Sequence, residues 1–137
     1  MYALGIDGGG SRTRALLCDA YGQIIGQGLS GGTNPRTSSA AELKVHLQEA
    51  IEQATRSIDC SKIIAAHFGL AGAGDAETKA KVRKITKEVL GEQTTCTIGH
   101  DLEIALAGGL ANNTGIVLVA GTGSACYGRT CDGRSAK

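Results

Sequence analysis

Two glycine turns, each directly after an apolar run, constrain this sequence most. The first is Asp7-Gly8-Gly9-Gly10-Ser11-Arg12-Thr13, and the second is Gly121-Thr122-Gly123-Ser124. Glycine lets backbone N–H groups face inward and lets an anion approach without a Cβ in the way. One such turn is more often only a hairpin. Two of them, with a carboxylate ending the first strand, predict a clamp that grips a phosphate-bearing ligand from two sides.

Composition narrows the class of protein. The 137 residues suffice for one domain, and 21 glycines with a single proline are not typical of a disordered chain. A net charge of +1 and few aromatic residues argue against nucleic acid or an anionic membrane as partner. The five cysteines are odd in number and scattered, and no secretory signal is evident, so we expect a cytoplasmic protein.

The order of elements predicts an α/β fold. Strand-like runs cover residues 2–7, 13–19, 23–29, 63–70 and 94–98. A capping box at Ser39 and Glu42 starts a helix over 39–58, Asp75 starts a second that Gly91 ends, and 101–110 form a third. The nearly continuous apolar run 63–70 is typical of a parallel strand buried on both faces. We therefore expect a mixed five-stranded sheet with helices on both faces, in the order β-β-β-α-β-α-β-α.

Four segments carry a resemblance to a known family. They are residues 5–13, Gly31-Gly32-Thr33-Asn34-Pro35, Gly99-His100-Asp101 and residues 117–124. Their order resembles the superfamily of sugar kinases, heat-shock ATPases and actin. Within it, the chain is similar to the BadF/BadG/BcrA/BcrD-type ATPase family, in the branch with N-acetylglucosamine kinase and glucosamine kinase. The resemblance implies a ribonuclease H-like, actin-like ATPase lobe.

The resemblance also implies a domain organisation. Kinases of this branch have two similar lobes, and their later segments Gly-Gly-Trp-Gly and Gly-Asp-Glu-Gly-Ser are not in this sequence. We therefore expect residues 1–112 to be the N-terminal lobe and residues 113–137 the opening hairpin of a second lobe. The chain is then a fragment of a longer protein, inactive by itself.

By resemblance, the two turns hold the phosphates of ATP. One side is formed by Gly8, Gly9, Gly10, Ser11, Arg12 and Thr13, and the other by Gly121, Thr122, Gly123 and Ser124. Asp7 holds Mg²⁺, through water, since Mg²⁺ prefers oxygen ligands and gives up water reluctantly. Two alternatives stay open: Asp7 as a plain strand-end turn residue and Arg12 as a surface residue.

Three positions are implied for the sugar. Asp101 matches the carboxylate that accepts the proton of the attacking hydroxyl, although it equally suits a helix cap. Asn34 matches a residue that hydrogen-bonds the sugar, and its alternative is an ordinary turn residue before proline. Gly72 lies after the fourth strand, where it would line the sugar pocket.

The function implied is that of an ATP-dependent amino-sugar kinase, with N-acetylglucosamine or glucosamine as acceptor. One rival is a BadF-type ATPase that activates a 2-hydroxyacyl-CoA dehydratase or benzoyl-CoA reductase. Another is a non-catalytic sugar sensor on the same fold. Kinases of this branch are commonly dimers, which leaves a homodimer as an open alternative; we expect neither nucleic acid nor membrane as partner.

Overall fold

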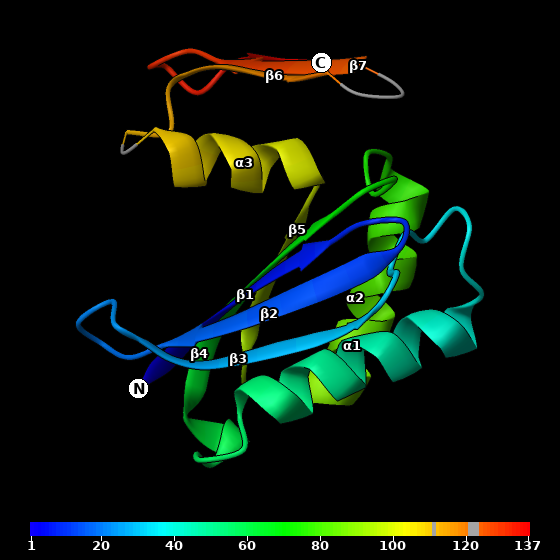
Figure 1. Ribbon diagram of the computed structural model, residues 1–137, viewed down its shortest axis with the longest axis vertical. Coiled ribbons are helices and arrows are strands. Elements are labelled where there is room, and N and C mark those ends of the chain that lie inside the picture. Colours follow the sequence, from blue (N-terminus) through cyan, green and yellow to red (C-terminus); the bar gives the residue numbers. More distant parts are fainter. Residues whose placement is uncertain (111, 121–123) are drawn as a thin grey trace. The chain divides into compact units, whose positions relative to one another are not determined.

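Five strands form one mixed sheet in the computed structural model, which describes residues 1–110, 112–120 and 124–137 (Figure 1). The sheet order is β3-β2-β1-β4-β5. β1 pairs antiparallel with β2, and β2 with β3, whereas β1, β4 and β5 run parallel. The strands are β1 (Tyr2–Gly8), β2 (Arg12–Cys18), β3 (Ile24–Gly31), β4 (Ile63–Leu70) and β5 (Thr95–Gly99).

Two helices cover one face of this sheet. α1 (Ala40–Ala54) packs along β3 and β2, and α2 (Ala76–Leu90) packs against β5 and α1. Alternate strand residues such as Leu4 and Ile6 are buried in one core with both helices, whereas Gly5 and Asp7 are exposed. Asp7 therefore lies on the sheet face opposite to α1 and α2.

The start of α1 follows the predicted capping box. Ser39 Oγ accepts from Glu42 N at 3.2 Å, and Ser39 N donates to Glu42 Oε2 at 2.9 Å. The predicted end at residue 58 is wrong, because the helix stops at Ala54. Thr55 caps it and returns its hydroxyl to Ile51 O at 2.8 Å. A 3-10 turn at Cys60–Lys62 then leads into β4.

Residues 101–137 form a second compact unit. It contains α3 (Asp101–Gly109), β6 (Gly115–Ala120), β7 (Ser124–Arg129) and the short β8 (Ser135–Ala136). The three strands pair antiparallel in the order β6-β7-β8, and α3 packs on them through Leu102, Leu106 and Tyr127. α3 therefore belongs to the same compact unit as the strands that follow it. The predicted boundary between two lobes at residue 112 refers to the domains of the whole protein, and it stays a prediction.

The expected fold class is confirmed. The element order β-β-β-α-β-α-β-α and the mixed five-stranded sheet are both present. Both helices of residues 1–100 share one face of the sheet, and the third helix is described with the second unit. No helix among the described residues is long and apolar enough to cross a membrane.

Candidate functional site

The first glycine turn joins β1 to β2 and is braced by two neighbouring loops. Gly9 N donates to Arg12 O at 2.9 Å, which closes the turn. Thr33 N donates to Gly9 O at 3.0 Å, and Ala71 N donates to Gly8 O at 2.7 Å. Two consecutive carbonyls of the turn thus each hold a different loop in place.

Position 8 requires glycine for steric reasons. A Cβ at Gly8 would collide with Thr33 Oγ1 and with the Leu70 side chain. Gly5, in the same strand, has no atom within 4 Å of the place where its Cβ would be. The close approach of the Thr33 loop to the turn therefore depends on the missing side chain at Gly8.

A small cavity of about 180 Å³ opens beside this turn, on the sheet face that α1 and α2 leave uncovered. It is lined by Asp7, Gly9, Ser11, Arg12 and Arg14. Four of these were predicted, and Arg14 was missed as a site residue. Arg14 is the register partner of Asp7 across β1 and β2, which places both side chains on the same face. Two guanidinium groups beside one carboxylate make the cavity suitable for an anion.

Thr13 has a buried side chain. Its side chain is 0% exposed, and its hydroxyl donates to Gly31 O at 2.7 Å and lies 2.8 Å from Thr33 Oγ1. The hydroxyl is therefore committed inside the protein and does not face the cavity. Thr13 therefore braces the loop after β3 through its side chain, and its predicted part in holding phosphate stays a prediction. Gly10 is exposed at the turn, where its carbonyl lies against Gly32.

The structure brings Asn34 and Gly72 together. Gly72 has φ +83°, and a Cβ there would collide with Asn34 Oδ1. Each of them directly follows a residue that is hydrogen-bonded to the glycine turn, Thr33 in one loop and Ala71 in the other. The two predicted sugar residues are thus linked by backbone hydrogen bonds to the predicted phosphate turn.

Arg36 connects these two loops, and sequence reasoning missed it. Its Nε donates to Gly72 O at 3.1 Å, and its Nη2 lies 3.0 Å from Asp75 Oδ2. Nothing in the sequence marks an exposed arginine after a proline as a cross-loop contact, because its partners lie more than thirty positions away.

Asp75 is the N-cap of α2, as predicted. Hydrogen bonds from the Thr78 backbone N–H and hydroxyl, followed by the Arg36 guanidinium, lower the pKa of Asp75 from 3.8 to about 2. The Asp75 carboxylate is therefore negative at neutral pH, where it forms an ion pair with the Arg36 guanidinium.

The remaining predicted residues lie in the second unit or outside the description. Asp101 is the first residue of α3 and is half-buried, and Ser124 starts β7 with an exposed side chain. Gly121, Thr122 and Gly123 lie outside the described residues. Asp101 as general base and residues 121–124 as a second phosphate turn therefore stay predictions.

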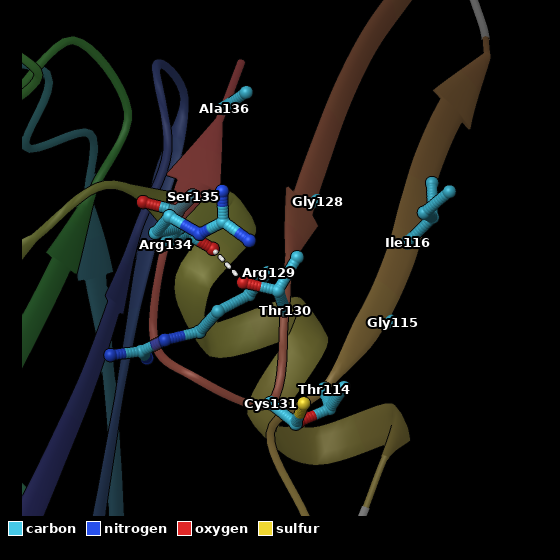
Figure 2. Close-up of a pocket in the computed structure, with 10 residues that line it drawn as sticks. All are labelled: Thr114, Gly115, Ile116, Gly128, Arg129, Thr130, Cys131, Arg134, Ser135 and Ala136. Carbon is cyan, nitrogen blue, oxygen red and sulfur yellow. Dashed lines mark hydrogen bonds between the residues drawn. The ribbon is translucent and has the colours of Figure 1, made fainter.

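A larger cavity of about 640 Å³ lies in the second unit and contains none of the predicted residues. It lies at the end of the β6–β7 hairpin where Gly115 pairs with Arg129. Figure 2 shows the Thr130 hydroxyl bonded to the Arg134 carbonyl, at 3.0 Å, at its edge. It is lined by Thr114, Gly115, Ile116, Gly128, Arg129, Thr130, Cys131, Arg134, Ser135 and Ala136. Its lining includes two arginines but no carboxylate, so we place the site at the smaller cavity, where Asp7 lies with Arg12 and Arg14.

Comparison with known proteins shows to which family this chain belongs. The profile of a family described as the BadF/BadG/BcrA/BcrD ATPase family matches residues 4–137. The chain belongs to this family. The predicted resemblance is thereby confirmed.

Relatives of this chain include named sugar kinases. An N-acetylmuramic acid/N-acetylglucosamine kinase of Clostridium acetobutylicum is 36% identical over 99% of this chain and 45% of its own length. An N-acetyl-D-glucosamine kinase of Dictyostelium discoideum is 27% identical over 98% of this chain and 45% of its own. The chain spans about half the length of these relatives.

Solved structures agree with this family assignment at the level of the fold. Structures described as putative N-acetylglucosamine kinases, from Chromobacterium violaceum and Porphyromonas gingivalis, are each 21% identical, with TM-scores of 0.77 and 0.79. They cover 98% and 93% of this chain, and the chain covers 47% and 44% of theirs. A glucokinase of the ROK family from Streptomyces griseus has a TM-score of 0.69 at 20% identity, over 98% of this chain and 47% of its own. These likenesses confirm the actin-like ATPase fold of the family.

Proposed function

We propose that the whole protein is an ATP-dependent amino-sugar kinase, and that this chain supplies its N-terminal part. The observation that carries the proposal is the linkage within residues 1–100. The glycine turn beside the charged cavity holds, through Gly8 O and Gly9 O, the two loops that continue into Gly72 and Asn34. A phosphate turn and two candidate sugar residues are thus fixed to one another by the backbone.

This arrangement suits phosphoryl transfer. The reaction asks for a positioned nucleophile, in-line geometry and donors around the transferring oxygens, and little covalent work from the protein. The N–H groups of Gly10 and Ser11 and the side chains of Ser11 and Arg12 would meet phosphate oxygens, whereas Gly9 N is already bonded to Arg12 O within the turn. In the proposal, Arg14 contributes a further positive charge from the same cavity. Residues 121–124 would close on the nucleotide from its other side.

The residues present also fit a magnesium ion. Mg²⁺ in such sites is held by one or two carboxylates together with substrate phosphates and water. Asp7 offers one exposed carboxylate at the cavity, which Ser11 also lines. No cluster of three acidic, histidine or cysteine side chains occurs among the described residues, so Asp7 would share the ion with the phosphates. The ion would neutralise charge on the transferring phosphoryl group.

The acceptor in the proposal is an amino sugar, with Asp101 as the base that takes its hydroxyl proton. Relatives are named as kinases of N-acetylmuramic acid, N-acetylglucosamine and glucosamine, which supports this substrate class. N-acetylglucosamine and glucosamine are our leading candidates. The five cysteines are all free, which suits the cytoplasm, and we include a homodimer in the proposal on the resemblance alone.

The test is ADP release by the full-length protein against a panel of sugars. We expect release to depend on an amino sugar and to be weak with glucose or without sugar. ATP hydrolysis at the same rate with and without sugars would contradict the proposal. Iron bound to the purified protein would instead favour the reductase-activating ATPase, and sugar binding without ADP release would favour a sensor.

A further inference from the structure

Arg36 is placed to align the candidate sugar residue Asn34. Its guanidinium bonds two groups of the loop between β4 and α2, the Gly72 carbonyl at 3.1 Å and the Asp75 carboxylate at 3.0 Å. The planar fork of arginine can make both contacts at once, which the single ammonium of lysine cannot do in the same geometry. One side chain therefore ties the loop before α1 to the loop before α2.

The backbone of residue 36, which any residue other than proline would supply, also orients the Asn34 side chain. Arg36 N donates to Asn34 Oδ1 at 3.0 Å, and only the oxygen of the amide can accept from an N–H. The oxygen also lies against Gly72, where a Cβ would collide with it. The Nδ2 group has no hydrogen bond within the described part of the chain. The amide oxygen is thus occupied, and its N–H donors are left for a ligand.

The backbone of the loop adds to this alignment. Asn34 O accepts from Thr37 N at 3.1 Å and from Ser38 N at 2.9 Å, which closes a turn around residue 34. Asp75 is itself fixed by Thr78, whose N and hydroxyl donate to it at 2.8 and 2.9 Å. Arg36 therefore joins two segments that are each already ordered locally.

We propose that Arg36 is a positioning residue for the sugar: its side chain holds the Gly72 loop against Asn34, so that the Asn34 amide keeps its place and its N–H groups face the substrate. This inference rests on the proposed function. Arg36 and Asp75 side chains are 63% and 45% exposed, and exposed ion pairs contribute little to stability. The effect of losing Arg36 is therefore expected mainly in sugar binding.

The experiment compares variants of the full-length protein in steady-state kinetics and in sugar titrations without nucleotide. Arg36→Ala should raise the KM and the Kd for the amino sugar about tenfold, the loss typical of a displaced hydrogen-bonding group, with kcat and the KM for ATP changed less than about twofold. Arg36→Lys should recover only part of the affinity. Lys44→Ala is the matched control, because it removes the Lys44–Glu88 pair, an exposed pair of 2.8 Å between α1 and α2 in which neither residue belongs to the two loops.

A double-mutant cycle tests whether Arg36 acts through Asn34. If it does, Arg36→Ala should weaken sugar binding much less in an Asn34→Ala background than in the wild type. Independent, multiplicative effects would overturn the inference, as would an unchanged sugar KM in Arg36→Ala or an equal loss of ATP affinity. These results leave the proposed function intact when the wild type phosphorylates an amino sugar; a wild type that neither binds nor phosphorylates one contradicts both.

Discussion

Gly5 and Gly8 both lie in β1, but only Gly8 has other atoms where a Cβ would be placed. The same substitution at the two positions therefore measures the effect of this crowding on stability. Gly8→Ala should lower the free energy of unfolding by about 1–3 kcal/mol, because its Cβ would be forced against Thr33 and Leu70. Gly5→Ala, with open space at its Cβ, should be neutral or stabilising by up to about 1 kcal/mol. Urea denaturation of both variants checks this. Equal losses would mean that the Thr33 loop does not press on the turn.

The buried hydroxyl of Thr13 supports a second prediction. Thr13→Val keeps the shape but leaves Gly31 O and Thr33 Oγ1 without this partner, so we expect a loss of about 1–3 kcal/mol. Thr95→Val makes the same chemical change at an exposed strand position and should have almost no effect. Chemical denaturation followed by circular dichroism measures both. A stable Thr13→Val variant would contradict the bracing role.

Sequence reasoning at the residue scale succeeded where chemistry is local. Asp7, Ser11 and Arg12 line one cavity because they are neighbours on a single turn. It missed Arg14, whose place depends on strand register, and Arg36, whose partners are in a distant loop. It gave no sign that the Thr13 hydroxyl is buried, because inward and outward residues of a strand differ by only one position.

At the scale of elements, the cap of α2 links stability to pH. The pKa of Asp75 is about 2 in the fold against 3.8 for the free side chain, lowered chiefly by Thr78. Because the pKa of Asp75 is lower in the folded than in the unfolded protein, its carboxylate stabilises the fold above pH 3.8, and this stabilisation is lost as the pH falls toward 2. Asp75→Asn keeps a good capping residue but cannot titrate. We therefore expect the urea midpoint of this variant to fall less than that of the wild type between pH 5 and pH 2.5.

The control for this pH dependence is Glu52→Gln. Glu52 is exposed on α1 and has no hydrogen bond or ion pair among the described residues. Its variant should keep the wild-type slope. The slope of Asp75→Asn will not vanish, because the pKa of Glu42 is also lowered, mainly by its hydrogen bond with Ser39. An unchanged slope in Asp75→Asn would show that the cap does not titrate as described.

Both helix starts and the end of α2 at Gly91 could be predicted from sequence, whereas the end of α1 could not. The side-chain signals at Ser39 and Asp75 act within one turn, and both helices begin there. The end of α1 depends on packing. A Cβ at Gly26 or Gly28 of β3 would collide with the carbonyl of Ala54 or Ala50, so the helix backbone lies directly on the strand. This contact is between segments far apart in sequence and has no local signal.

At the scale of the whole molecule, Asp101 carries the proposed chemistry. Asp101→Asn should lower turnover by about 10²-fold or more while sugar affinity stays near wild type, because a general base acts in the transition state. Asp132→Asn is the control from the same unit, since Asp132 is an exposed carboxylate bonded to Thr130 and Arg134. Steady-state kinetics and sugar titration separate the two effects. Unchanged turnover would remove Asp101 from the mechanism.

The fold and family could be predicted from the whole pattern of segments, because four motifs in order are far more specific than any one. The pairing of the two glycine turns stays a prediction. It depends on how lobes close around a ligand, which is set by interactions between distant parts of a longer protein and not by local sequence.

The fate of the γ-phosphate of ATP tests the central claim most directly. The full-length protein is incubated with ATP, magnesium and N-acetylglucosamine or glucosamine, and the products are followed by ³¹P NMR. The account predicts that the γ-phosphate appears as a sugar phosphomonoester, in step with ADP. Its appearance as inorganic phosphate with the sugar unchanged would contradict the account.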